Sequence, residues 1–416
     1  MAPGLLTQIR VRAVQSARSL LETAASVLGE DENADRRRGA GSQDIGDAPG
    51  PDASAAQRLR DSASIGSPTP EGDYEIRIDE GRLPPAPWAN VIANPAGGFL
   101  VTERGAGCTW AASSYFYRLT PWHNDPVCDP LGEVLYLRDE ETGATWSPTP
   151  APLPVQGRYT VRHAPGASTF EHQRDGIATT LVLGLHETAA AKLTWLRITN
   201  RGDRPRRLAL TAYAEWTLGA LREHTQHQVQ TSFDPSLRTI LARNRFDPQF
   251  GGLVAFCALS DQLASHTADR REFLGRNGDV SDPAGLAHLL SGATGAGLDA
   301  CAALRSVIEL APGEHRDVAV VLGAAEGEEA ARGLVAGLGA AADVLRAIDA
   351  NRERWLERLS VIAVRTPEPS LDLLLNRWLL YQALSCRMWG RTALYQSSGA
   401  FGFRDQLQDA MALVYA

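Results

Sequence analysis

The chain has 416 residues, of which 44% are hydrophobic, and a formal net charge of −8. That length exceeds one ordinary hydrophobic core and predicts two or three domains. The acidic charge disfavours nucleic acid as a partner, because such binding usually needs a basic face. Five scattered cysteines without CxxC spacing argue against a disulfide framework and a zinc site. No apolar run reaches the ~18 residues of a membrane span.

The residue pattern over 1–72 predicts a helical leader followed by a disordered linker. Apolar residues recur at roughly helical spacing from Leu5 to Leu28. Asp, Glu, Arg, Gly, Ser and Pro then dominate residues 31–72, a composition that cannot bury a core. The start lacks an apolar stretch followed by a small-residue cleavage site, so we assign no signal peptide.

The residue pattern over 73–325 predicts a large antiparallel β-sandwich. Short runs alternate apolar and polar residues and are separated by turn residues such as Asn200-Arg-Gly-Asp203. Some 250 residues of short strands without regular helices are typical of a sandwich. The clearest predicted strands are residues 74–78, 179–185, 193–198, 207–213 and 318–322.

Helical spacing replaces the strand pattern in the last ninety residues. Residues 326–365 predict a helical linker, with one helix over 328–359. A break containing Pro367 and Pro369 begins the segment 366–416, which predicts helices over 371–389 and 406–415. Strands first and helices afterwards predict a β + α multidomain protein rather than an alternating α/β fold.

A Gly-rich aromatic loop near residue 400 leads into Arg404, Asp405 and Asp409. Carboxylates accept and Arg donates paired hydrogen bonds, which suits the hydroxyls of a sugar. Asp405 and Asp409 are four residues apart and share one helix face. The alternative interpretation is a helix N-terminus that carries Asp because of the helix dipole.

A second concentration of Trp, Asn, Pro and Asp lies in residues 87–150. Aromatic faces and amides there could contact a saccharide. We favour the structural interpretation, in which these residues fix irregular loops of the sandwich. His224 and His227 have a loose metal-ligand spacing, but no third ligand completes it, so the sequence predicts no metal site.

Several strings in the chain resemble the glycoside phosphorylases of glycoside hydrolase family 94, formerly glycosyltransferase family 36. The likeness covers about residues 74–416 and is greatest to the C-terminal phosphorylase-like region of cyclic β-1,2-glucan synthases. The strings that carry it are Pro87-Trp-Ala-Asn-Val-Ile-Ala-Asn-Pro95, Leu119-Thr-Pro-Trp-His-Asn-Asp-Pro126, Arg138-Asp-Glu-Glu-Thr-Gly143, Trp146-Ser-Pro-Thr-Pro150, Tyr213-Ala-Glu-Trp216, Arg276-Asn-Gly278 and Gly402-Phe-Arg-Asp-Gln-Leu-Gln-Asp409.

The resemblance implies a β-supersandwich over 73–325, a helical linker over 326–365, and the first helices of an (α/α)6 barrel over 366–416. It also implies inverting phosphorolysis of a β-glucosidic bond, with one Asp as general acid and inorganic phosphate as the attacking co-substrate. No metal or organic cofactor is implied. Ser113-Ser-Tyr-Phe-Tyr117 departs from the family's Asn/Ser-Arg-Glu-Asn type of segment.

By resemblance, Arg404 and Asp409 match positions that hold hydroxyls of the donor sugar, and Asp405 and Gln408 lie beside them. The general acid is expected downstream and matches no residue here, so no catalytic residue is assigned. We therefore expect an inactive N-terminal fragment of a β-glucan or β-glucoside phosphorylase. The alternatives are a carbohydrate-binding or chain-length-governing module of a cyclic β-1,2-glucan synthase, and a glucoamylase-like hydrolase.

The expected partner is a β-glucan or another β-linked glucosyl saccharide. A homodimer and a parent synthase remain open as assemblies. The expected location is the bacterial cytoplasm, or the inner membrane through an upstream synthase region.

Overall fold

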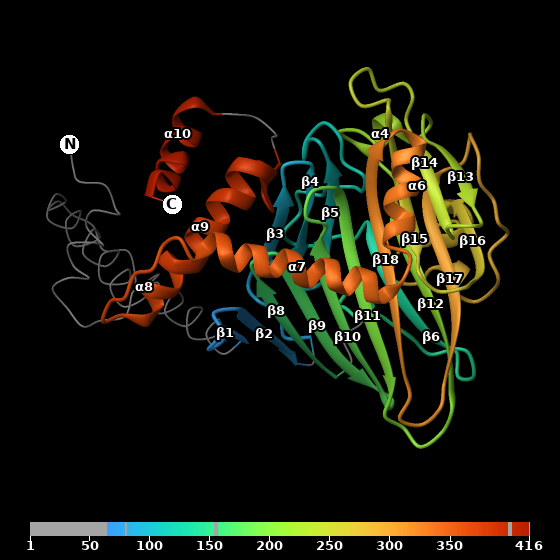
Figure 1. Ribbon diagram of the computed structural model, residues 1–416. Coiled ribbons are helices and arrows are strands. Elements are labelled where there is room, and N and C mark those ends of the chain that lie inside the picture. The colour runs from blue at the N-terminus through green and yellow to red at the C-terminus, as the bar shows by residue number, and fades with distance from the viewer. Residues whose placement is uncertain (1–64, 80, 154–156, 398–401, 416) are drawn as a thin grey trace, which may run out of the picture.

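Two facing antiparallel sheets make up most of the molecule (Figure 1). The computed structural model describes residues 65–79, 81–153, 157–397 and 402–415, so most of the predicted leader and linker over 1–72 lies outside the described residues. The larger sheet has ten strands in the order β1 (Gly66–Pro68), β2 (Tyr74–Asp79), β8 (Arg158–Ala164), β9 (Ala167–Arg174), β10 (Ile177–Leu185), β11 (Ala190–Asn200), β18 (His315–Glu326), β15 (Leu253–Leu259), β14 (Thr239–Arg243) and β13 (Gln230–Asp234).

Smaller sheets complete the β part of the fold. The facing sheet has five strands in the order β16 (Leu263–Asp269), β17 (Ala300–Leu310), β12 (Arg206–Glu215), β6 (Glu133–Asp139) and β7 (Thr145–Trp146). A three-stranded sheet consists of β3 (Ala89–Asn94), β4 (Gly97–Thr102) and β5 (Gly107–Ala111). Short helices α4 (Arg222–Thr225) and α5 (Arg270–Leu274) and a 3-10 turn (Ala284–Leu286) lie in the loops.

The core forms where alternate side chains of the two large sheets meet. In β10, Leu181, Leu183 and Leu185 point into this core, as the period of two along a strand requires. The intervening Val182 belongs instead to a second apolar cluster on the outer face of the ten-stranded sheet. Both faces of the central strands are therefore buried, which explains their long hydrophobic runs.

Two helices cover that outer face. The sequence predicted a single helix over 328–359, and this prediction was wrong: α6 (Gly327–Gly337) and α7 (Ala341–Leu359) are separate. The break falls at Gly337-Leu338-Gly339, where two glycines disfavour a continuous helix. In α7, Val344 and Ile348 are fully buried against the sheet, and Ile348 lies so close to Gly184 that a Cβ there would be 3.0 Å from it.

A helical rod follows α7. A small hairpin and a last helix come after the rod and end the described part of the chain. The rod runs through α8 (Pro369–Leu373), a π segment (Leu374–Trp378), α9 (Leu379–Gln382) and a second π segment (Ala383–Gly390). The hairpin pairs β19 (Thr392–Ala393) with β20 (Gln396–Ser397), and α10 (Phe403–Met411) continues into a 3-10 turn (Ala412–Tyr415). No helix of the described residues is long and apolar enough to cross a membrane.

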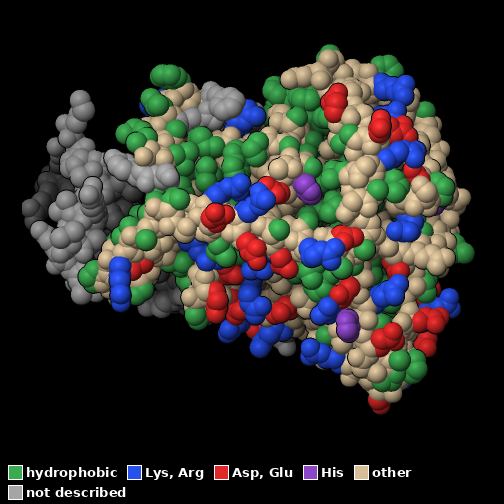
Figure 2. All heavy atoms as spheres, in the orientation of Figure 1, with side chains coloured by type: hydrophobic (Ala, Val, Ile, Leu, Met, Phe, Trp, Pro, Cys, Tyr) green, Lys and Arg blue, Asp and Glu red, His purple; other side chains and the backbone are tan. Residues whose placement is uncertain are grey.

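Side-chain hydrogen bonds, two of them buried, bind the helical rod to the β part. Tyr381 donates its hydroxyl to the Val91 carbonyl at 2.8 Å, and Ser385 donates to the same oxygen at 2.6 Å. Trp378 donates its indole N–H to the Gly72 carbonyl at 3.1 Å. Figure 2 shows hydrophobic side chains gathered over this end of the molecule, where Leu379 is 49% exposed. The observed architecture confirms the predicted β + α fold class, a large antiparallel sandwich followed by helices.

Candidate functional site

The four residues predicted to contact a sugar lie on one face of α10. Arg404, Asp405, Gln408 and Asp409 are one, four and five residues apart, which places them on adjoining positions of a helix surface. The Arg404 side chain is 84% exposed and that of Asp405 is 58% exposed. Arg404 Nη2 lies 3.3 Å from Asp405 Oδ1. We call these four residues the polar face of α10.

Asp409 has a partner that the sequence did not reveal. Arg387, in the second π segment of the rod, donates from Nε to Asp409 Oδ2. Both side chains keep more than a third of their surface exposed. Sequence reasoning missed Arg387 because the 22-residue separation gives no local signal. The contact fixes the Asp409 carboxylate relative to the rod.

This arrangement can bind hydroxyl groups. Arg404 and Gln408 supply N–H donors, and the carboxylates of Asp405 and Asp409 supply acceptors, all on an open surface. A pyranose hydroxyl donates and accepts at once, so a mixed set of this kind can hold two or three of them. The helix begins just after Gly402, whose missing side chain leaves backbone accessible beside Arg404.

The asparagines of the string 87–95 have structural partners. Asn90 donates to the Ala164 carbonyl at 2.9 Å, and so ties β3 to the turn between β8 and β9. Asn94 donates to the carbonyls of His186 and Ala189 at 2.8 and 2.9 Å, while its Oδ1 accepts from Gly97 N at 2.9 Å. These contacts support the structural interpretation of the segment.

Asp139 and Ser147, from two further strings of the segment, also connect neighbouring strands. Asp139 is completely buried, accepts from the backbone N–H groups of residues 141 and 142, and forms an ion pair with Arg206. Ser147 accepts a hydrogen bond at its carbonyl from Tyr159, at 2.9 Å. Their role in this structure is to hold β6 and β7 against neighbouring strands.

Buried Glu103 fixes Trp88 in the same region. Its Oε2 accepts from Trp88 N at 2.7 Å, and the nearby Asp129 carboxylate adds negative charge. Burial, with a smaller contribution from Asp129, raises the pKa of Glu103 from 4.5 to about 7. Since the folded pKa is raised, the stabilisation from the protonated carboxyl is complete below pH 4.5 and is lost as the pH rises through 7.

Replacing Glu103 with Gln should therefore flatten the dependence of stability on pH. Relative to wild type, Glu103→Gln should gain about 3 kcal/mol of unfolding free energy between pH 4.5 and pH 8, because Gln keeps an acceptor and never ionises. Urea unfolding at several pH values measures this. Buried His163, whose pKa burial lowers to about 4, acts in the opposite direction but is common to both proteins. Parallel curves for the two proteins would contradict the prediction.

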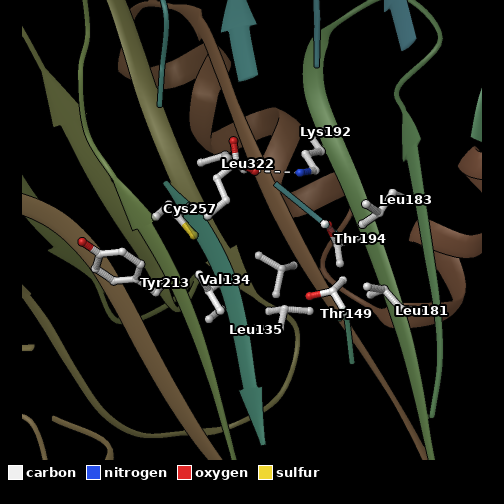
Figure 3. Close-up of a pocket in the computed structure, with 15 residues that line it drawn as sticks. Val134, Leu135, Thr149, Leu181, Leu183, Lys192, Thr194, Tyr213, Cys257 and Leu322 are labelled. Atoms are coloured by element: carbon white, nitrogen blue, oxygen red, sulfur yellow. Dashed lines mark hydrogen bonds and ion pairs between the residues drawn. The ribbon is translucent and has the colours of Figure 1, made fainter. Parts of the chain in front are cut away.

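A small pocket lies inside the sandwich and is lined mostly by apolar side chains. Lys192, the only lysine of the chain, reaches into it from β11 and donates to Glu133 Oε2 at 2.7 Å (Figure 3). Glu133 Oε1 also accepts from Thr109 and Thr120, each at 2.6 Å. The free space of about 60 Å³ suits a few water molecules and is too small for a sugar ring. This pocket is not a candidate sugar site.

The histidine pair gives no metal centre. Across the described ranges, no group of three or more His, Cys, Asp and Glu side chains is placed to hold a metal ion. His224 and His227 lie in and just after α4. Glu215, near them, pairs with Arg222 Nε at 2.6 Å and Arg270 Nε at 2.9 Å, so the charges of this edge form a structural network.

The comparisons with known proteins agree on a family. Residues 72–340 match the glycosyl hydrolase 94 supersandwich domain, and residues 354–416 match the glycosyl hydrolase 94 superfamily catalytic domain. Over 345 residues the chain is 38% identical to the cyclic β-(1,2)-glucan synthase NdvB of Rhizobium meliloti (strain 1021), covering 82% of this chain and 12% of that protein. Over 342 residues it is 28% identical to the N,N'-diacetylchitobiose phosphorylase of Vibrio furnissii, covering 79% and 42%.

A solved bacterial glucoamylase complexed with acarbose has a TM-score of 0.43 and 7% identity over 71% of this chain and 39% of that one. The chain thus spans less than half the length of each of these proteins. The supersandwich match alone covers more than half of the chain, and the catalytic-domain match contains α10 with its polar face. This chain therefore belongs to glycosyl hydrolase family 94.

Proposed function

We propose that the chain provides the supersandwich and the donor-sugar wall of an enzyme that transfers a β-linked glucosyl unit to inorganic phosphate with inversion. The observation that carries the proposal is the polar face of α10, which lies within the part that matches the family's catalytic domain. Phosphorylases among the relatives support the reaction type. Inorganic phosphate would be the co-substrate.

Arg404 would donate to hydroxyls of the donor glucose and Asp409 would accept from them. Asp405 and Gln408 would add contacts on either side. Arg387 would keep Asp409 in place when no sugar is bound, through the ion pair between the rod and α10. The proton for the leaving oxygen would come from a general acid of the full catalytic domain, and phosphate would attack the opposite face of the sugar.

A second candidate function is favoured by the 38% identity to a cyclic β-(1,2)-glucan synthase. In that case the chain would bind β-1,2-glucan as a module that governs chain length within a larger synthase. Its location would then be the cytoplasmic side of the inner membrane, and its partner would be the parent synthase. If the chain instead belongs to a phosphorylase that is separate from any synthase, we propose that it assembles as a homodimer.

Replacing Arg404 with Gln, or Asp409 with Asn, should weaken binding of D-glucose and of sophorose (β-1,2-glucobiose) to the chain. Loss of a charge-assisted hydrogen bond costs about 1.5–3 kcal/mol, so we expect roughly tenfold to hundredfold weaker binding by isothermal titration calorimetry. Arg346→Gln is the matched control, because Arg346 is an exposed arginine on α7. Equal affinities for Arg404→Gln and wild type would refute a role in donor-sugar binding.

A further inference from the structure

A polar groove lies on the outer face of the ten-stranded sheet, near its β1 edge. It is lined by residues 67–71, by outward side chains of β2, β8 and β9, and by Arg352 of α7. Its free space of about 540 Å³ falls within the roughly 300–1,000 Å³ of small-molecule sites. Figure 2 shows acidic and basic side chains intermixed over this part of the molecule, below α7. We call it the outer groove.

The strand pattern sets polar side chains in a row across the outer groove. In β2, Ile76 belongs to the core, so its neighbours Glu75 and Arg77 point outward, as the period of two along a strand requires. Arg162 of β8 lies directly opposite Glu75, and Thr169 of β9 lies opposite Arg162. Three adjacent strands therefore present a carboxylate, a guanidinium and a hydroxyl side by side.

The segment 67–71 is held in one conformation beside this row. Thr69 donates its backbone N–H to the Asp73 carbonyl at 2.8 Å. Arg377 of the rod donates to the Glu71 carbonyl at 2.7 Å and to Asp73 Oδ1 at 2.5 Å. This side of the outer groove is thus formed before any ligand arrives, so little conformational entropy is lost on binding.

Ion pairs leave the outer groove with many hydrogen-bonding groups. The Glu75 carboxylate lies 2.7 Å from Arg77 Nη2 and 2.8 Å from Arg162 Nε. The Arg77 side chain is 63% exposed and that of Arg162 is 38% exposed, so both keep N–H groups within reach of a ligand. Arg352 is attracted by the Asp73 carboxylate but forms no hydrogen bond to another residue that the structure describes.

These groups favour a neutral ligand that is rich in hydroxyls. The guanidinium groups of Arg77, Arg162 and Arg352 share the groove with the carboxylates of Glu71 and Glu75, so an anion or a cation would meet repulsion as well as attraction. An apolar ligand would bury these polar groups without partners. A saccharide hydroxyl can donate to a carboxylate and accept from a guanidinium at the same time.

We propose that the outer groove binds a neutral β-linked oligosaccharide and is a second saccharide site of the chain. Arg77 and Arg352 would donate to its hydroxyls, and Glu71 would accept from them. The inference goes beyond the donor-sugar function, because it uses no residue of α10. Under the second candidate function, the same groove would hold the β-1,2-glucan.

Affinity electrophoresis of the 416-residue chain in native gels that contain linear β-1,2-glucan tests the outer groove. The Arg404→Gln variant is the background, because it weakens the polar face of α10. In this background Arg77→Gln/Arg352→Gln should reduce glucan affinity at least about tenfold, since two charged donors are lost. Arg204→Gln/Arg346→Gln is the matched control: it makes the same change of charge at two exposed arginines outside the groove and should bind like the background.

A second variant tests the outer groove without changing its charge. Thr169→Leu, in the same background, removes a hydroxyl and adds an apolar side chain beside Arg162, so it should also weaken glucan binding. Thermal unfolding followed by circular dichroism should give the same melting temperature for Arg77→Gln/Arg352→Gln as for its matched control, which shows that lost binding is not lost folding.

The outcomes separate this inference from the proposed function. Unchanged glucan affinity in Arg77→Gln/Arg352→Gln would overturn the outer groove and leave the roles of Arg404 and Asp409 untouched. Loss of all glucan binding in Arg404→Gln alone would also overturn it, because the glucan would then bind only at α10.

Two further results count against the outer groove. If Arg77→Gln/Arg352→Gln loses affinity for inorganic phosphate in titration calorimetry but keeps its affinity for glucan, the groove binds anions and the inference fails. If glucan does not retard the wild type at all, the inference fails as well, while calorimetry with D-glucose and sophorose still decides the donor-sugar function.

Discussion

Replacing Lys192 with Met should destabilise the protein by about 3–5 kcal/mol, the typical cost of breaking a buried ion pair from one side. The Lys192 and Glu133 side chains are 11% and 14% exposed, and they lie 2.7 Å apart inside the sandwich. Without the ammonium group, the Glu133 carboxylate stays buried with only the hydroxyls of Thr109 and Thr120 as partners. Urea unfolding followed by tryptophan fluorescence measures the loss.

The double variant Lys192→Met/Glu133→Gln shows whether the unpaired charge is the cause. The introduced glutamine would be neutral and would keep an acceptor for the threonine hydroxyls, so most of the lost stability should return. Arg204→Met is the exposed control: Arg204 pairs with Glu141 at 2.7 Å, with both side chains about half exposed, and its loss should cost under about 1 kcal/mol. If the double variant is as unstable as Lys192→Met, the effect comes from lost packing instead.

Periodicity predicted the central strands well because each of them lies between two apolar layers. The predicted strands 179–185 and 193–198 fall within β10 and β11, which pair in register from Ile177 with Asn200 to Leu185 with Lys192. The pattern failed where Asn and Gly interrupt a buried strand. β3 and β4 are buried on almost every residue and rich in Asn and Gly, so sequence reasoning treated them as loops.

The candidate site was predictable only in its local part. Residues four apart on a helix share a face whatever the fold, so the polar face of α10 follows from the sequence alone. The contact of Arg387 with Asp409 and the anchoring of Arg118 at Ser397 join residues 22 and 279 positions apart. Such contacts depend on how the rod docks on the β part, and no local pattern encodes them.

The solvent exposure of Tyr115 and Phe116 could not be predicted from the sequence either. Aromatic residues in a sandwich sequence are most often core residues, and buried Tyr117, next in the chain, fits that expectation. What exposes its neighbours is the backbone turn closed by Ser113 and the burial of Arg118 beneath it. Tyr117 and Arg118 occupy the inward-facing positions of this turn. The rings of Tyr115 and Phe116 therefore lie on the surface.

Replacing Trp355 with Ala should cost about 3–5 kcal/mol, as for other large aromatic residues of a core. Trp355 of α7 is 1% exposed, and its ring lies 4.6 Å from that of Tyr381 and 5.3 Å from that of Trp389. It also fits against the turn at Gly166, where an added Cβ would come within 2.3 Å of its Cδ1. One side chain therefore connects the sandwich, α7 and the rod.

Loss of this connection should appear first in the rod. Hydrogen exchange of residues 379–390 should accelerate in Trp355→Ala even under native conditions, because their docking onto β3 then depends on the hydroxyls of Tyr381 and Ser385. Leu356→Ala is the matched control: Leu356 is the next residue of the same helix, is 49% exposed, and should change stability by less than about 0.5 kcal/mol.

Gly166→Ala tests the same contact from the other side. It strains a backbone φ of +78° and forces the new methyl group into the Trp355 ring, so it should lower stability and accelerate exchange in the same residues. If Trp355→Ala lowers stability while exchange in 379–390 stays as slow as in wild type, Tyr381 and Ser385 hold the rod without Trp355. In that case the position of the rod, which contacts α10 through Arg387 and Asp409, depends on those two hydroxyls together with the hydrogen bond from Trp378 to Gly72.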